Sequence, residues 1–184
     1  VLLLSNPSSF FHADNRNLIS GAGSALSIAA ISAAEKTFMD QVNPNKKPIL
    51  ITPKLLLVGT ALKVTAEDLY KEKLINESTA AKPAATSNPH GGKYKPYVSP
   101  FLNNTAIKDQ DGKAINGQSA TQWYLMASPT TRAAIVIAFL NGKRNPTIES
   151  ADAEFQTLGM QWRAYDDFGV AMEEPVAAVK SNGL

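Results

Sequence analysis

The sequence predicts an α+β fold, and three observations support this prediction. Hydrophobic residues make up 44% of the 184 positions, which is enough for the core of one large or two small domains. Two stretches have apolar residues at helical spacing, while several short apolar runs bounded by turn residues are typical of strands. The two kinds of pattern are intermixed without the regular strand–helix–strand period of a doubly wound sheet.

The first predicted elements are a short strand and a long helix. Residues 1–4 are apolar and are followed by an Asn-Pro break, so a strand is expected there. Ser24 is the expected N-cap of a helix over residues 25–42, whose apolar residues form a broad face. A second Asn-Pro pair ends this helix.

Two apolar runs and a second helix are predicted next. Residues 48–53 read PILITP, a short β-branched run between prolines that predicts a buried strand, and residues 54–59 form a second apolar run. Thr65 is followed three residues later by Asp68, which resembles a capping box and predicts a helix over residues 66–74.

The middle of the chain is rich in loop and turn signals. Residues 77–92 combine small polar residues with prolines and glycines, which predicts an exposed, mobile loop. Two prolines within residues 94–102 exclude a central position in a sheet, so an edge strand is expected there. An Asp-Gly pair within residues 107–115 predicts a hairpin turn.

The C-terminal part of the chain has the densest strand pattern. An aromatic-rich segment from Trp123 leads to an apolar strand over residues 133–140, which an Asn-Gly turn and an Asn-Pro break follow. Two short strands are expected at residues 159–165 and 168–172. Core packing explains most of the aromatic residues in this part, and some are candidate interface anchors.

Charge and composition narrow the function. The chain has 18 Lys and Arg residues against 16 Asp and Glu residues, and this balance argues against a dedicated nucleic-acid binder. The absence of cysteine excludes disulfides and cysteine-based zinc sites. No apolar run reaches the roughly 18 residues that a membrane-spanning helix needs. The start, VLLL without a methionine, indicates a chain cut from something longer, through processing or truncation.

Three short motifs resemble ligand sites but are better explained by turns and caps. A His-x-Asp pair at residues 12–14 has metal-ligand spacing, yet too few further ligands exist, so capping is expected. The Asp-x-Asp-Gly run at residues 109–112 lacks the later positions of a calcium loop. The Gly-x-Gly at residues 21–23 lacks the third glycine of a dinucleotide site. No catalytic, cofactor-binding or metal-binding residue is therefore predicted.

Dispersed carboxylates leave one enzymatic alternative open. Acidic residues at 149–154, 166–167 and 173–174 offer pairs of the kind that a glycosidase uses. At turns and strand ends such residues are usually solvated, or they face the basic residues of a neighbouring subunit. The basic and aromatic mixture at residues 93–97 is interpreted as an edge strand with lysine gatekeepers rather than a single-strand nucleic-acid surface.

Several segments form an ordered pattern. They are Phe11-His12-Ala13-Asp14 with Asn17, the helix from Ala25 with the following PILITPKLLLV, the strand at 133–140 with its Asn-Gly turn, and residues 159–180, where Arg163 precedes Asp167-Phe168-Gly169-Val170-Ala171. This set resembles tailed-phage major capsid proteins of the HK97-type fold, most of all the Mu-like prophage major head subunits. The first segment resembles their Phe-His-x-Asp-His-x-Asn signature, with Asn15 at the position of the second His.

The resemblance implies an HK97-type capsid fold, with a mixed sheet flanked by helices in the axial (A) domain and an incomplete peripheral (P) domain. Residues 1–20 would enter from the P domain, residues 21–148 would form the A-like domain, and residues 149–184 would supply the C-terminal P-like strands. The chain resembles only the later part of such a protein, with the N-terminal arm, E-loop and spine helix upstream. Residues 77–92 would form an axial or surface-facing loop.

The function implied is structural. The chain would be a major capsid subunit that performs no reaction and needs no cofactor, assembled in the bacterial cytoplasm into a virion shell that encloses DNA. Its partners would be copies of itself in pentamers and hexamers, without specific nucleic-acid recognition or a membrane. The isolated chain would be a monomer or small oligomer, with both chain ends on the smaller of two sub-domains. The alternatives are a hydrolase with dispersed carboxylates and a minor phage decoration or tail protein.

Overall fold

A computed structural model describes residues 10–75, 86–152 and 159–184. The chain forms two compact units: Val1–Ala134 with Glu174–Leu184 make up the larger one, and Ile135–Glu173 the smaller one. The first and last described residues belong to the larger unit, so the expectation that both chain ends lie on the smaller one is wrong. The strand predicted at residues 1–4 lies outside the described residues.

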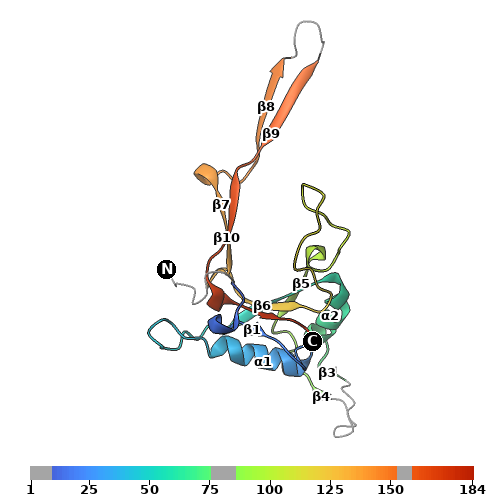
Figure 1. The fold of residues 1–184 in the computed structure, drawn as a ribbon, viewed down its shortest axis with the longest axis vertical. Helices are drawn as coiled ribbons and strands as arrows, with labels where there is room; N and C mark the ends of the chain where they lie inside the picture. The colour runs from blue at the N-terminus through green and yellow to red at the C-terminus, as the bar shows by residue number, and fades with distance from the viewer. Residues whose placement is uncertain (1–9, 76–85, 153–158) are drawn as a thin grey trace. The chain divides into compact units, whose positions relative to one another are not determined.

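A five-stranded mixed sheet forms the centre of the larger unit (Figure 1). Its order is β1-β11-β6-β2-β5, in which the outer pairs β1–β11 and β2–β5 are parallel and the inner pairs are antiparallel. The last strand thus lies between the first strand and β6, which joins segments from both ends of the sequence. The α+β prediction is confirmed. The strands are β1 (Leu18–Ile19), β2 (Pro53–Val58), β5 (Lys95–Val98), β6 (Trp123–Ala127) and β11 (Ala178–Ser181).

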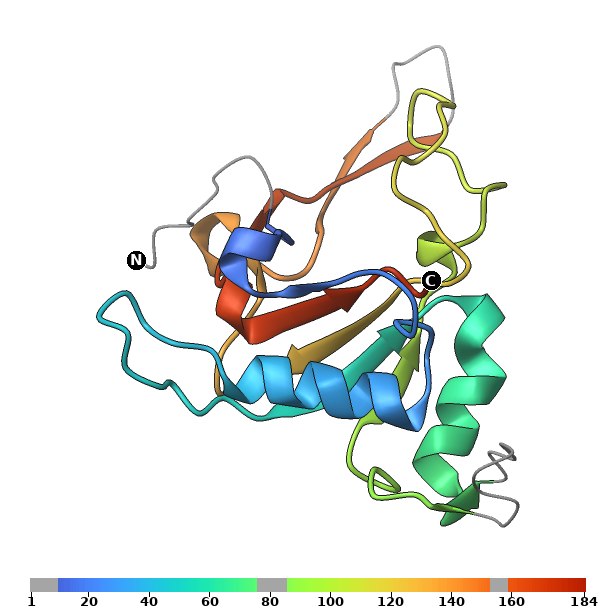
Figure 2. The ribbon, with the colours of Figure 1, turned by 60° about the horizontal axis from the view of Figure 1, so that its bottom comes forward.

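The first helix, α1 (Ile28–Met39), lies along β11 in Figure 2. The predicted start after Ser24 is wrong, because Ser27 is the N-cap and its Oγ accepts a hydrogen bond from the Ala30 N–H at 3.1 Å. Ser24 instead accepts a hydrogen bond from the Leu184 N–H at 2.8 Å and so holds the C-terminal segment. One stripe of the helix is buried, formed by Ile28, Ala30, Ile31, Ala34 and Phe38.

The second helix, α2 (Lys63–Lys71), follows a short 3-10 turn, η2 (Thr60–Leu62), and packs beside β5 and β2. The predicted capping box is wrong, because its residues lie inside the helix and the N-cap, Leu62, makes no side-chain capping bond. The helix also ends earlier than predicted, since Leu74 already belongs to β3 (Leu74–Ile75), which pairs with β4 (Thr86–Ser87).

The apolar run at residues 48–53 is not a strand. Leu50 has a φ of 53°, which lies in the left-handed region and breaks an extended backbone. Pro48 forms only an isolated bridge with Val42, and the strand β2 begins at Pro53. The second apolar run therefore forms the buried strand, and the first one leads into it.

The predictions for the middle of the chain are partly confirmed. The proline-containing strand β5 does lie at the sheet edge, followed by η3 (Pro100–Leu102), and the Asp-Gly pair lies in a turn closed by the Lys108–Ala114 bridge. The prediction of an exposed loop at residues 77–92 is wrong for its described part, residues 86–92, because Asn88 and His90 are buried. Residues 77–85 lie outside the described residues.

The smaller unit is a two-stranded antiparallel ribbon, which is visible in Figure 1. β7 (Ile135–Phe139) pairs with β10 (Phe168–Met172), and β8 (Thr147–Asp152) pairs with β9 (Met160–Tyr165). A joint between the two halves contains η4 (Leu140–Gly142), where the predicted Asn-Gly turn has two positive φ angles. The strands predicted at residues 159–165 and 168–172 are confirmed, and each pairs with an upstream strand.

The core of the larger unit lies between the sheet and α1. Trp123 is fully buried on β6, and its Nε1–H donates a hydrogen bond to the Ser24 carbonyl at 3.0 Å. The Ser181 hydroxyl of β11 donates to the same carbonyl at 2.7 Å. The other large, fully buried apolar side chains are Ile31, Phe38, Leu56, Val58, Leu125 and Val179.

Candidate functional site

One face of the ribbon's first half consists of large apolar side chains. In an antiparallel pair, residues directly opposite each other point to the same side of the sheet. The β7–β10 register therefore gathers three apolar pairs on one face and leaves only small or medium residues on the other. The three pairs are Ile135–Met172, Ile137–Val170 and Phe139–Phe168.

The second half of the ribbon has one polar face and one face on which large apolar residues alternate with small and polar ones. On the polar face, Arg163 Nε donates a hydrogen bond to Glu149 Oε2 at 2.6 Å across the strands, and the Tyr165 hydroxyl donates to Glu149 Oε1 at 3.3 Å. By register, positions 150, 152 and 164 share the opposite face with three large apolar residues, which are Ile148, Met160 and Trp162. These three residues and the six of the first half are called the apolar face from here on.

The apolar face is uncovered. Eight of its nine side chains are exposed, with accessible fractions from 46% to 66%, and the ninth, Phe139, is half-buried. Along residues 160–172 the even-numbered positions are apolar except at 164 and 166, while the odd-numbered ones are polar or small. Such alternation is typical of a strand with one buried face. A two-stranded ribbon alone is marginally stable in water, so this face has the composition of a surface that requires a cover.

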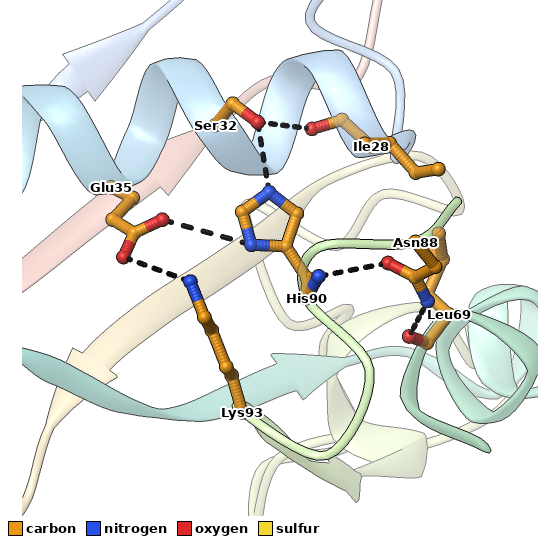
Figure 3. A network of polar contacts seen from close by, with 7 residues as sticks. All are labelled: Ile28, Ser32, Glu35, Leu69, Asn88, His90 and Lys93. Atoms are coloured by element: carbon orange, nitrogen blue, oxygen red, sulfur yellow. Dashed lines mark hydrogen bonds and ion pairs between the residues drawn. The ribbon is translucent and has the colours of Figure 1, made fainter. Parts of the chain in front are cut away.

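A second polar cluster lies in the larger unit, around a buried histidine (Figure 3). His90 is 3% exposed, its Nε2 lies 2.8 Å from the Ser32 hydroxyl, and its Nδ1 lies 3.6 Å from Glu35 Oε2. Lys93 Nζ lies 3.7 Å from the other oxygen of that carboxylate. Asn88 Oδ1 accepts a hydrogen bond from the His90 backbone N–H at 3.0 Å.

The hydrogen bonds around His90 indicate its proton arrangement. Ser32 Oγ donates its only proton to the Ile28 carbonyl at 2.9 Å, so it accepts from the His90 Nε2–H. Nδ1 is then the acceptor nitrogen of a neutral ring, and it is buried without a hydrogen-bond partner among the described residues. Burial lowers the pKa of His90, an effect that the nearby Glu35 carboxylate opposes. Burial also raises the pKa of the neighbouring Tyr94, and Glu35 adds to that shift.

The sequence matches the profile of a family described as "Phage capsid protein" over residues 2–181. This match covers nearly the whole chain. The chain belongs to this phage capsid protein family. No curated protein sequence matches it at a significant level.

Family membership settles the general class of function. Phage capsid proteins are structural proteins, so the prediction that the chain is not an enzyme is confirmed. The family also implies that copies of the chain assemble with one another and that the protein is located in the virion. Among the described residues of this capsid protein, the apolar face of the ribbon is the surface whose composition fits such assembly.

In this capsid protein, the Ser32–His90–Glu35 cluster only superficially resembles a catalytic triad. A catalytic triad needs a carboxylate hydrogen-bonded to the histidine Nδ1 and a serine hydroxyl free to attack. Here the distance from His90 Nδ1 to Glu35 Oε2 exceeds hydrogen-bond range, and the Ser32 hydroxyl donates its proton to a helix carbonyl. The space enclosed between His90, Tyr94 and the neighbouring helices has no room for a water molecule. The cluster therefore joins α1 to the 88–94 segment.

The segment Phe11–Asn17, which resembles the signature of the Mu-like head subunits, forms a structural bracket in this chain. His12 Nδ1 accepts a hydrogen bond from the Asp14 N–H at 3.2 Å and caps the 3-10 turn η1 (Ala13–Asn15), so the capping interpretation is confirmed. Asn17 is fully buried and donates to the carbonyls of Phe10 and Pro175 at 2.9 and 3.0 Å. The bracket thus holds the start of the described chain against the η5 turn (Pro175–Ala177).

The acidic residues that supported the hydrolase alternative are dispersed in this capsid protein. Glu149 is paired with Arg163 on the ribbon, and Glu174 is paired with Arg132 at 2.8 Å in the larger unit. Asp166 and Asp167 border a hollow of about 250 Å³ at the ribbon joint. No group of three or more His, Cys, Asp or Glu residues within the described ranges is arranged to hold a metal ion. None of the described helices is long and apolar enough to cross a membrane.

Sequence reasoning missed two features of the site. It placed His90 and Asn88 in an exposed loop, because glycines and prolines surround them, and no local signal in the sequence indicates the buried network. It expected the strands 159–165 and 168–172 but not their pairing with β8 and β7. The alternation of apolar residues along 160–172 was the signal for the amphipathic ribbon.

Proposed function

We propose that the chain is the major head subunit of a tailed phage or prophage, with an HK97-type fold and closest kinship to the Mu-like head subunits. The observation that supports this most is the uncovered apolar face of the ribbon in a member of the phage capsid protein family. A shell subunit needs such a surface, because every copy must bury apolar area against its neighbours. The FHADNRN segment adds the specific resemblance, since its His12, Asp14 and Asn17 are all used in the bracket.

We further propose a modified domain assignment. The sequence-based borders, 21–148 and 149–184, would separate β7 from β10 and would group β11 with the ribbon. The compact units instead group β7 to β10 together and return β11 to the sheet. The proposed A-like domain is therefore the larger unit, and the proposed P-like part is the ribbon, Ile135–Glu173. Assembly into pentamers, hexamers and an icosahedral shell around DNA is part of the same proposal and rests on the resemblance to the head subunits.

The composition of virions tests the proposed role. A major head subunit is the most abundant protein of DNA-filled particles and remains with the heads when the tails are removed. Quantitative mass spectrometry of banded particles, with heads and tails separated, measures the copy number of this chain against the other virion proteins. Recovery of the chain at low copy number, or with the tails, would support the decoration or tail alternative and contradict the proposal.

The isolated chain provides a second test. We propose that it is a monomer or small oligomer in solution, because the ribbon offers one apolar surface and the larger unit has a closed core. Light scattering and sedimentation measure this state directly. Particles of shell size from the purified chain would contradict this part of the proposal.

A further inference from the structure

We infer that the apolar face of the ribbon pairs with the same face of a second copy of the chain. This inference rests on the proposed shell function and names the partner of the same surface. The two ribbons would pack face to face as a small sandwich, with the Ile135–Met172, Ile137–Val170 and Phe139–Phe168 pairs of each copy at its centre. Two layers that cover each other are the ordinary solution for sheets with one apolar face.

The ribbon's charges favour a protein partner over nucleic acid or a membrane surface. Residues 135–173 contain three cations, at positions 143, 144 and 163, against six carboxylates, at positions 149, 152, 154, 166, 167 and 173. Nucleic acid and anionic lipid both select surfaces with excess positive charge. The guanidinium of Arg163 is moreover paired with Glu149 within the ribbon.

The size and chemistry of the face favour a second copy. Eight exposed side chains that each offer roughly 100 Å² of apolar surface would bury about 800 Å² per partner, which is the size of a standard interface. The three pairs of the first half carry no charge that would require a complementary group, so this part of the face is chemically complementary to itself. Two-fold pairing of identical patches is the commonest symmetry of homo-oligomers. Copies of a capsid protein also meet at high local concentration by the nature of the family.

Single-cysteine variants test the inference, because the natural chain contains no cysteine. Val170→Cys places a thiol on the apolar face, and Ala171→Cys places one on the opposite face, one residue away. Both positions are exposed in the free chain, so they form a matched pair. Each full chain is treated with a short bis-maleimide over a range of protein concentrations, and covalent dimer is measured on a denaturing gel. Circular dichroism verifies that both variants retain the fold.

We expect Val170→Cys to form dimer at least about 10-fold faster than Ala171→Cys at the same concentration, with a rate that rises with concentration. Equal rates for the two variants would overturn the inference. A Val170→Cys thiol that resists a monofunctional maleimide while the chain sediments as a monomer would also overturn it, because another segment then covers the face. A thiol that reacts freely at every concentration without dimer would show an uncovered face and would overturn it as well.

The outcome is distinguishable from the test of the proposed function. Copy number in virions concerns the role of the protein and does not depend on which surface pairs with which. A chain that is abundant in heads but gives no dimer through Val170→Cys would keep the shell function and refute the face-to-face pairing. A chain that dimerises through this face but is absent from heads would keep the face-to-face pairing and refute the shell function.

Discussion

Replacing Asn17 with alanine should destabilise the larger unit by roughly 2–4 kcal/mol. The side chain is fully buried, accepts a hydrogen bond from the His12 N–H at 3.0 Å, and donates to the Phe10 and Pro175 carbonyls. Both carbonyls keep a second partner, because Asn15 Nδ2 also donates to Phe10 and the Ala178 N–H donates to Pro175. The substitution therefore leaves one donor unsatisfied, which costs about 1–3 kcal/mol, and removes two net-favourable bonds of about 0.5–1.5 kcal/mol each, partly offset by relaxation.

The substitution Asn17→Asp separates hydrogen bonding from side-chain size. The introduced carboxylate can still accept from the His12 N–H, but it faces two carbonyl oxygens where the amide donated. Burial and these oxygens raise its pKa in the native state above the unfolded value, so the native state binds more protons between the two pKa values. Stability of this variant should therefore rise as the pH falls through that window, whereas the alanine variant should show no such gain.

Urea unfolding followed by far-ultraviolet circular dichroism measures both effects. Asn104→Ala is the control, because Asn104 is an exposed turn residue whose side chain accepts only from the Ala106 N–H. Its loss should cost less than about 1 kcal/mol. An Asn17→Ala chain within about 0.5 kcal/mol of the natural one would refute the account of the bracket.

Three further predictions concern other parts of the larger unit. Because burial lowers the pKa of His90, this side chain takes up a proton in the unfolded chain at a higher pH than in the folded one, and the free energy of unfolding should fall as the pH drops below about 6.5. Urea midpoints measured over this pH range should show the fall, and His90→Gln should remove it. Ser32 should not react with a fluorophosphonate probe, because its proton is bound within the helix; labelling detected by mass spectrometry would reopen the hydrolase alternative. Gly183→Ala should lower the melting temperature by several degrees, because the new Cβ would overlap the Thr121 carbonyl, while Gly112→Ala, also at positive φ but in open space, should cost only about 1 kcal/mol.

The parts of the fold that the sequence predicted are those that local chemistry determines. Pro96 keeps β5 at the sheet edge, and the Asp-Gly and Asn-Gly pairs lie in turns with positive φ. The C-terminal strands were also predictable, because a strand pattern depends only on neighbouring residues. The general family was recognisable from the order of these elements, and the profile match confirms it.

The parts that sequence reasoning missed depend on contacts between distant residues. Ser24 has the chemistry of an N-cap, but it holds Leu184 at the other end of the chain, and Ser27 caps the helix instead. The run PILITP has strand propensity throughout, yet Leu50 adopts a left-handed conformation that no local signal predicts. His90 is buried because α1 supplies Ser32 and Glu35 around it, and that neighbourhood exists only in the folded chain.

The energetics of the apolar face explain how a shell subunit can be weakly associating and yet suited to assembly. Its eight exposed side chains each offer roughly 100 Å² of apolar surface, so covering each one contributes at most about 2.5 kcal/mol. The gross gain for a face-to-face pair would be about 40 kcal/mol, but buried area does not convert into affinity at this rate. Association costs about 4–15 kcal/mol, and the ordering of side chains costs more. Interfaces of this size range from micromolar to picomolar affinity, and we expect the weak end of this range, with the free chain dissociated at low concentration. In a closed shell each copy makes several contacts at once, so modest contacts of this kind become collectively strong through effective concentration.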